Sequence, residues 1–278
     1  MTDAPPLWRY LPSRSEEIAL LVTIPHTGVY VPPDVAAHFA TAEMGTGTMA
    51  DWHLHELYAF LPQLGVDVIH ATHHRFVVDL NRPPDATPLY PGRFETGLVP
   101  THTFQGETIW RTEPDAAEIA RRMRQFHRPY HQAVEHRLRE KVEQFGRCYL
   151  IDAHSVESRA NRLHAALEQD IYLGDRDGRT CDPWFTQFVR GLFEKRGLSV
   201  SVNHPYKGGY TTAHYATANG GPVEDVQTLQ IEMCQRLYMK EGEPRGAPET
   251  KLFAAFGDTL RAVFDEIADA IRAPQSKC

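Results

Sequence analysis

Four strand-like segments of this sequence are each followed at once by side chains that can do chemistry. The residues that follow them are Pro25-His26-Thr27-Gly28, Asp152-Ala153-His154-Ser155, Asn203 to Gly209 (NHPYKGG) and Glu232. A single histidine in such a place is more often a hydrogen-bonded structural residue than a ligand. Two histidines and a late glutamate, all at strand ends of one sheet, are a stronger indication of a site, because ligand sites in α/β sheets lie beyond the carboxyl ends of the strands.

Two of these histidines and one aspartate suit a metal site. Hydrolytic zinc sites use three protein ligands and leave a fourth position open. His26 and His154 are the candidate imidazole ligands, and Asp51 is the candidate carboxylate. Asp51 can also be the N-cap of a helix, and His53 and His55 are rival ligands that cannot share a helical face. We predict that His26, Asp51 and His154 converge on one Zn²⁺ at about 2.0–2.2 Å, although other divalent metals would fit the same ligands.

Glu232 is the predicted general base. Hydrolysis at a zinc site still needs a carboxylate to accept a proton from water. Glu232 follows the apolar run that ends at Ile231. A glutamate at the end of a buried strand is costly unless it is paired or takes part in function.

The segment Arg75 to Arg82 (RFVVDLNR) places two arginines and an asparagine around a short apolar run. The planar guanidinium group can form two parallel hydrogen bonds with a carboxylate. Arg75, Asn81 and Arg82 are therefore candidate substrate-binding residues, suited to a ligand that carries a carboxylate. The alternative is a structural ion pair between Asp79 and Arg82.

The turn NHPYKGG is predicted to complete the substrate site with Asn203, Tyr206 and Lys207. Lys207 would supply a third cation from a turn made flexible by two glycines. The alternative for Lys207 is a solvated loop lysine.

Alternating strands and helices must position these residues. The predicted strands cover 18–24, 66–71, 76–80, 148–151, 170–173, 198–202 and 228–231, and the predicted helices cover 51–64, 113–145 with a break near Pro129, 183–195 and 252–272. This order predicts an α/β fold, a three-layer α/β/α sandwich with a mixed, largely parallel sheet. The chain has 278 residues and no internal repeat, so we expect one domain over 1–278.

Composition narrows the class of protein. The net charge is −7, which disfavours a nucleic-acid partner and requires that cations be gathered locally around an acidic substrate. The four cysteines form no CxxC pair, which indicates reduced thiols and a cytoplasmic protein. No signal peptide and no run of about 20 apolar residues is evident, so no membrane association is expected. The expected partner is a small molecule, and the oligomeric state is left open.

Together these motifs resemble the N-formylglutamate amidohydrolases. PHTG, DWH, RFVVDLNR, LYPG (89–92), DAHS, NHPYKGG and LQIEMCQRLYM (229–239) occur in order between about residues 20 and 240. The resemblance implies a fold similar to zinc carboxypeptidases and aspartoacylases, and hydrolysis of N-formyl-L-glutamate to formate and L-glutamate in histidine degradation. It assigns metal binding to His26, Asp51 and His154, catalysis to Glu232, and carboxylate binding to Arg75, Asn81 and Arg82.

Two segments depart from the family pattern, at 156–170 and at 225–228. The resemblance therefore leaves the acyl group and the amino acid open, and a related metallo-amidase or carboxypeptidase-like hydrolase acting on another N-acyl amino acid is the alternative. A non-catalytic protein that senses an acidic metabolite is a third hypothesis. It would be expected to lose the base or a ligand, whereas His26, His154 and Glu232 are all present.

Overall fold

The computed structural model describes residues 4–89, 92, 94–242 and 250–273, and it is built around one mixed sheet. The strand order is β1-β3-β2-β4-β7-β5-β6. The strands are β1 (Trp8–Leu11), β2 (Leu20–Ile24), β3 (Asp67–Ala71), β4 (Cys148–Val156), β5 (Ile171–Gly174), β6 (Val200–Val202) and β7 (Val226–Cys234).

The centre of the sheet is parallel and its two edges are reversed. β3, β2, β4 and β7 run in one direction, whereas β1 pairs with β3 antiparallel. β5 pairs antiparallel with β7, and β6 runs parallel to β5. The predicted mixed, largely parallel sheet is confirmed. The carboxyl ends of β2, β4 and β7 lie together at one end of the sheet, whereas β5 and β6 point the opposite way, with Gly174 level with Gln230 and Val202 level with Leu173.

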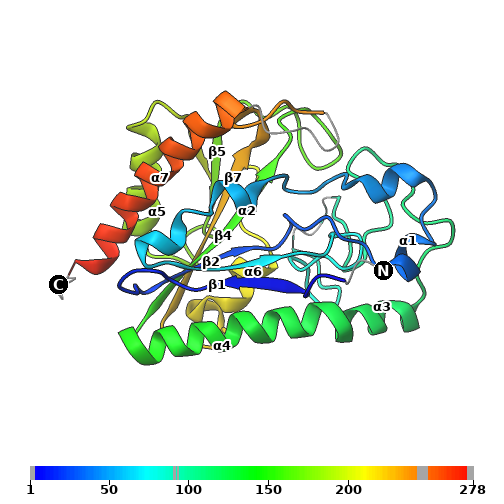
Figure 1. Cartoon of the computed structure of the whole chain (residues 1–278), viewed down its shortest axis with the longest axis horizontal. Helices are drawn as coiled ribbons and strands as arrows, with labels where there is room; N and C mark the ends of the chain where they lie inside the picture. The colour runs from blue at the N-terminus through cyan, green and yellow to red at the C-terminus, as the bar shows by residue number, and fades with distance from the viewer. Residues whose placement is uncertain (1–3, 90–91, 93, 243–249, 274–278) are drawn as a thin grey trace.

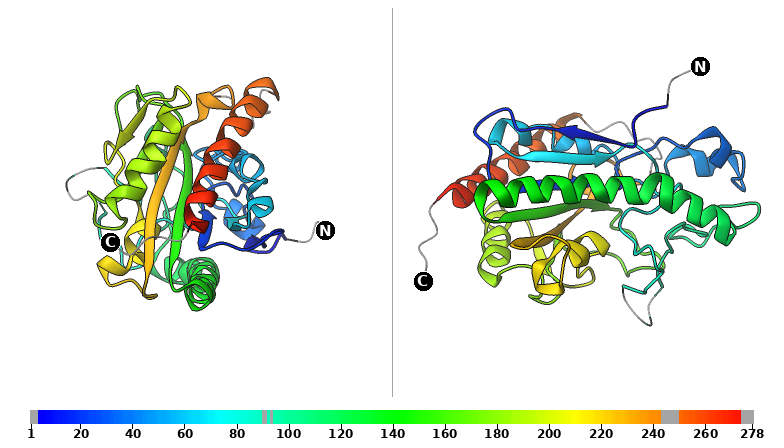
Figure 2. Two further views of the ribbon diagram at one scale, coloured as in Figure 1. Left: turned by 90° about the vertical axis from the view of Figure 1, so that its left-hand side faces the viewer. Right: turned by 90° about the horizontal axis from the view of Figure 1, so that it is seen from below.

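Helices cover both faces of the sheet and make the three layers (Figure 1 and Figure 2). The α-helices are α1 (Pro33–Ala36), α2 (Leu54–Leu57), α3 (Ala116–Arg122), α4 (Arg128–Phe145), α5 (Pro183–Glu194), α6 (Tyr210–Tyr215) and α7 (Thr250–Arg272). α2, α5 and α7 pack on one face, against a core that includes Val22 and Ile231. α4 and α6 pack on the other face, against Leu21 and Leu150. Adjacent residues of one strand therefore point to different cores, which explains its continuous apolar sequence.

Two predicted helices differ in detail. Only Leu54–Leu57 and a 3₁₀ turn at Leu61–Leu64 are helical within 51–64, and His53, at φ 57°, stands at the N-cap in place of Asp51. The predicted break near Pro129 is a π-helical turn over Met123–His127 that joins α3 to α4. Pro129 directly follows this turn within the continuous helix, and because proline has no N–H to donate, the regular hydrogen-bond ladder is interrupted at this point.

The strand predicted at 76–80 is wrong, because this segment forms turns outside the sheet. Phe76 and Val77 are fully buried in a separate apolar cluster beside Trp110. Their backbone carbonyls accept hydrogen bonds from the Arg122 guanidinium at 3.1 and 3.3 Å. A helix side chain thus satisfies the backbone groups that a neighbouring strand would otherwise pair.

A buried ion cluster ties β3 to α4. Asp67 Oδ2 lies 3.0 Å from Lys141 Nζ and 2.7 Å from Arg137 Nε, and Glu17 contacts both cations. Asp67 and Lys141 are fully buried. Burial alone would raise the pKa of Asp67, but Lys141, Arg137 and the Ser13 N–H hold it below its usual value.

Within the described part of the chain, no helix is both long and apolar enough to cross a membrane.

Candidate active site

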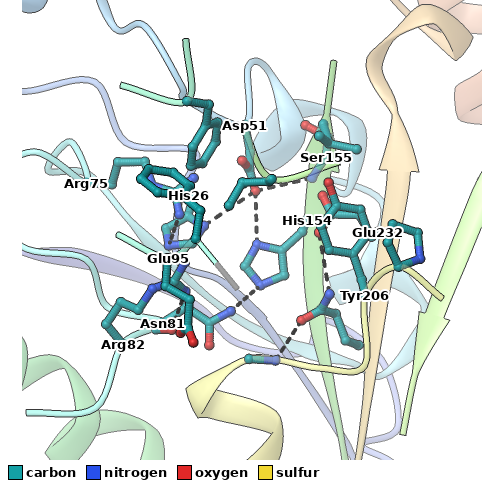
Figure 3. Close-up of a pocket in the computed structure, with 17 residues that line it drawn as sticks. His26, Asp51, Arg75, Asn81, Arg82, Glu95, His154, Ser155, Tyr206 and Glu232 are labelled. Carbon is teal, nitrogen blue, oxygen red and sulfur yellow. Dashed lines mark hydrogen bonds and ion pairs between the residues drawn. The ribbon is translucent and has the colours of Figure 1, made fainter. Parts of the chain in front are cut away.

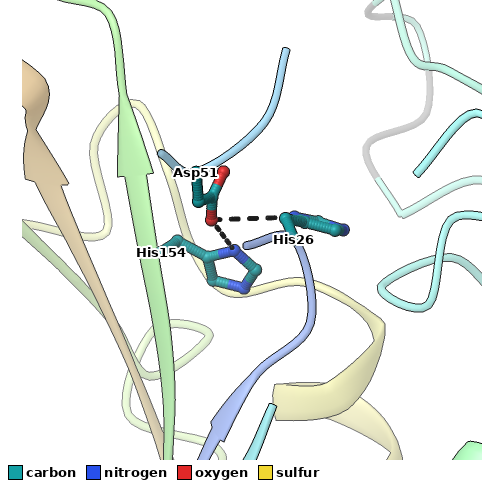
Figure 4. A group of neighbouring side chains, drawn as sticks. All are labelled: His26, Asp51 and His154. Carbon is teal, nitrogen blue, oxygen red and sulfur yellow. Dashed lines mark hydrogen bonds and ion pairs between the residues drawn. The ribbon is translucent and has the colours of Figure 1, made fainter. Parts of the chain in front are cut away.

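Three predicted ligands meet beyond the centre of the sheet (Figure 4). His26 follows β2, Asp51 precedes α2, and His154 lies within β4, which extends to Val156. Their candidate ligand atoms all lie within 4.8 Å of one another, and all three side chains are buried. Asp51 Oδ2 is 3.1 Å from His154 Nδ1 and 3.9 Å from His26 Nδ1. This His–Asp–His group can bind a metal ion.

The far nitrogen of each imidazole is held by a second carboxylate. His26 Nε2 donates to Asp79 Oδ1 at 2.7 Å, and His154 Nε2 donates to Asp152 Oδ2 at 2.8 Å. With the proton on Nε2, each Nδ1 lone pair is left on the side of Asp51. Carboxylates fix metal-binding histidines in this way in many metal sites, and the donor set fits a divalent cation.

The sequence motifs alone do not predict this role for Asp79 or Asp152. The contact between Asp152 and His154 can be predicted from the sequence, because residues two apart in a strand lie on the same face of the sheet. No sequence pattern indicates the role of Asp79, because the sequence predicts a strand where the structure has the turn that brings Asp79 to His26.

The electrostatic surroundings of the two histidines differ, and positive charge is favoured at His154. Burial and the nearby Arg75 guanidinium lower the pKa of His26. Burial also acts against protonation of His154, but Asp152 and Asp51 outweigh it and raise the pKa of His154 well above its usual value. A metal cation in contact with Asp51 and the His154 Nδ1 atom would supply the same positive charge next to these carboxylates.

Glu232 faces the same cavity from β7 (Figure 3). It is paired with His154 in the β4–β7 register. Its side chain is buried, and Gln230 Nε2 donates to Glu232 Oε2 at 3.4 Å. Burial raises the pKa of Glu232 to about 8 against the opposing effect of His154 and Arg75. A buried carboxyl with a raised pKa in a cavity suits proton transfer near neutral pH.

Arg75, Asn81 and Arg82 line this cavity together. The ion pair of the segment is between Arg75 and Asp79, with Nη2 donating to Oδ2 at 2.8 Å, and not between Asp79 and Arg82. Arg82 donates instead to the carbonyls of Thr96 and Asn81 at 2.8 and 3.0 Å. Among the residues that the structure describes, no carboxylate forms a salt bridge with Arg82.

Two histidines of the long helical region hold this segment in place. His131 Nε2 donates to the Leu80 carbonyl at 2.8 Å, and His127 Nε2 donates to the Arg82 carbonyl at 3.0 Å. Tyr215 OH lies 2.8 Å from His131 Nδ1. Burial lowers the pKa of both histidines, so they are neutral at pH 7. Neither histidine is predicted from the sequence, although their i, i+4 spacing places both on one helical face.

The turn after β6 contributes only in part. Tyr206 lines the cavity, but Asn203 and Lys207 do not. Asn203 bonds Asp175 at 2.6 Å, and Lys207 Nζ pairs with Asp177 at 2.8 Å. The prediction places all four strands in one direction, whereas β6 is parallel to β5 and therefore opposite in direction to β7. β6 ends at Val202, level with Leu173 of β5 and so with Ile231 of β7, and Pro205, Tyr206 and Gly209 of the turn line the cavity.

Comparison with known proteins identifies the family. Residues 18–239 match the family described as N-formylglutamate amidohydrolase. The chain belongs to this family. It is 37% identical to the N-formylglutamate deformylase of Pseudomonas putida over 230 residues, which cover 82% of this chain and 84% of that one. It is 34% identical to the N-formylglutamate deformylase of Pseudomonas aeruginosa PAO1 over 259 residues, covering 92% and 93%.

A solved structure of the family agrees with the fold. The crystal structure of N-formylglutamate amidohydrolase from Ralstonia eutropha JMP134 superposes with a TM-score of 0.79 at 28% identity, covering 95% of this chain and 98% of that one. The family resemblance inferred from the motifs is confirmed. As an N-formylglutamate amidohydrolase family member the chain is an enzyme, which excludes the non-catalytic sensor.

The two segments that depart from the family pattern, 156–170 and 225–228, lie in different parts of the fold. Val156 and Leu163, from the departing segment 156–170, line the cavity of this amidohydrolase. In the segment 225–228, Gln227 bonds Asp182 near the start of β7, at the opposite edge of the sheet. Tyr90 and Pro91 of the LYPG motif lie outside the described residues.

Proposed function

We propose that the protein hydrolyses N-formyl-L-glutamate to formate and L-glutamate with Zn²⁺ as its metal. The observation that carries the proposal is the arrangement of His26, Asp51 and His154 beside Glu232 in one cavity. The names of the two Pseudomonas relatives support the substrate. Zinc is supported by the donor set, because two imidazoles and one carboxylate are typical of hydrolytic zinc sites.

The three ligands would hold the metal, which supplies Lewis acidity for the formyl carbonyl and acidifies water. Glu232 accepts a proton from the attacking water and delivers it to the amide nitrogen as the C–N bond breaks. Oxygen from water ends on the formyl carbon, and the nitrogen leaves as the amine of glutamate. Asp79 and Asp152 keep His26 and His154 in the tautomer that presents Nδ1 to the metal.

The remaining cavity residues bind the amino-acid part. Arg82 is the principal carboxylate ligand in this proposal, because the described structure gives it no salt bridge of its own. The Asn81 side chain accepts from the Thr211 N–H at 2.9 Å and lies 3.0 Å from His154 Nε2, so it links the substrate side of the cavity to the metal side. Arg75 adds positive charge, although Asp79 neutralises part of it.

The test is metal analysis of the purified protein combined with a formate-release assay on N-formyl-L-glutamate. We expect about one zinc per chain, loss of activity on chelation and recovery with zinc. Full activity after exhaustive chelation would disprove the metal assignment. Zinc binding without formate release from N-formyl-L-glutamate, but with release of another acid from another N-acyl amino acid, would favour the related metallo-amidase.

A further inference from the structure

A second compartment adjoins the active-site cavity on the far side of Asp51 and shares part of its wall. Both cavities are lined by Asp51, Arg75, Phe104, Ser155 and Val156. Beyond this shared wall, the second compartment has a volume of about 250 Å³. Asn81 and Arg82 line only the first cavity and not the second. Figure 3 shows Asp51 and Ser155 at the opposite end of the cavity from Asn81 and Arg82.

The position of this compartment relates it to the acyl side of the scissile amide, provided that the proposed function holds. In that proposal the carboxylates of the substrate lie at Arg82 and Asn81, and its amide carbonyl lies at the metal ligands. The acyl substituent then points away from Arg82, past Asp51. The acyl carbon of a formyl group carries only a hydrogen atom, so N-formyl-L-glutamate would place no part of itself in the second compartment.

The lining of the compartment is mainly polar. Gln105, Asn161 and Gln235 contribute amides, while Arg159 and Glu157 form an ion pair at 3.0 Å. Polar walls favour an occupant that can return hydrogen bonds, because polar groups left unpaired on binding cost free energy.

We propose that this compartment is an acyl pocket and that the enzyme also hydrolyses N-acyl-L-glutamates whose acyl group is short, polar and larger than formyl. The reaction is the same hydrolysis. Water oxygen bonds to the acyl carbon, the C–N bond breaks, the nitrogen takes the proton, and the products are a carboxylic acid and L-glutamate.

The experiment compares kcat/KM for N-formyl-, N-acetyl- and N-succinyl-L-glutamate in the zinc-loaded protein. We expect the two larger substrates to retain at least about one hundredth of the kcat/KM for N-formyl-L-glutamate, because accommodated groups change specificity only modestly. The variant Gln105→Trp places a bulky ring in the compartment and is expected to lower the ratio of N-succinyl to N-formyl kcat/KM at least about tenfold. Gln144→Trp, at an exposed position of α4, is the matched control and should leave that ratio unchanged.

The other outcomes distinguish a failure of the acyl-pocket proposal from a failure of the proposed function. Hydrolysis of N-formyl-L-glutamate alone would overturn the acyl pocket and leave the proposed function intact. Hydrolysis of N-succinyl-L-glutamate with a ratio that Gln105→Trp does not change would also overturn it, because the acyl group would then lie elsewhere. Failure to hydrolyse any of the three would contradict the proposed function itself.

Discussion

His154 donates its Nε2 hydrogen to Asp152 Oδ2 at 2.8 Å, from two residues later on the same strand. Thr23 Oγ1 donates to the other oxygen of Asp152 at 2.7 Å, so this carboxylate is fixed from two sides. The bond determines which imidazole nitrogen is available to Asp51 and to a metal.

Replacing Asp152 should therefore weaken metal binding without removing a ligand. We expect Asp152→Asn to lower zinc affinity about 10- to 100-fold, the usual effect of losing a carboxylate behind a metal-binding histidine. Chelator competition measures it, with the exposed Asp177→Asn as the control. An unchanged zinc affinity in Asp152→Asn would show that His154 does not depend on this bond for metal binding.

Arg82 should discriminate between acidic and neutral substrates. Arg82→Ala is expected to raise KM for N-formyl-L-glutamate by a factor equivalent to about 2 kcal/mol or more, because a carboxylate loses its guanidinium partner. Steady-state kinetics with N-formyl-L-glutamate and a neutral N-formyl amino acid make the comparison. An equal loss on both substrates would mean that Arg82 is structural, through its bonds to the Thr96 and Asn81 carbonyls.

His131 should affect catalysis through the position of Asn81 and Arg82. His131→Phe removes the donor to the buried Leu80 carbonyl, which should destabilise the fold by about 1–3 kcal/mol. We expect KM to rise while zinc content stays normal. His136→Phe, an exposed change on the same helix, is the matched control. If KM in His131→Phe stays at the wild-type value, the helix does not position the substrate segment.

Asp67 should contribute stability that depends on pH. The pKa of Asp67 is lower in the folded state than in the unfolded state. Its contribution to the free energy of unfolding is therefore complete above the unfolded-state pKa of about 4 and is lost as the pH falls through the lower folded-state pKa. At pH 7, Asp67→Asn should cost about 3–5 kcal/mol, because Lys141 and Arg137 lose a buried partner. Urea unfolding measures this cost, with exposed Asp258→Asn as the control. A cost below about 1 kcal/mol, the value of an exposed pair, would contradict the role assigned to Asp67.

The sequence predicted the central strands because they are buried on both faces. Leu20–Ile24 and the start of β4 are continuous apolar runs. The places of His26 and His154 could be predicted because each histidine comes soon after one of these runs in the sequence. The sequence did not predict β1 (Trp8–Leu11), a short edge strand in which Trp8 and Leu11 are only partly buried and Arg9 and Tyr10 are exposed. A strand at an edge with solvent on one side has no such apolar run.

Strand direction was the main information that the sequence lacked. An apolar run does not indicate whether it pairs parallel or antiparallel, so Asn203 and Lys207 were placed with His26 and His154. The fold of 76–80 was also beyond reach, because it depends on Arg122 donating to carbonyls 45 and 46 residues away in sequence.

The central claim is that Glu232 transfers the proton while three other residues hold the metal. Glu232→Gln retains the volume of the side chain and removes its basicity, so zinc content and substrate affinity should stay near normal. Turnover should fall at least about a hundredfold, the usual contribution of a general base. Zinc content, substrate affinity by calorimetry and formate release are to be measured on one preparation, beside the exposed control Glu224→Gln. A turnover within a few fold of wild type in Glu232→Gln would contradict the account.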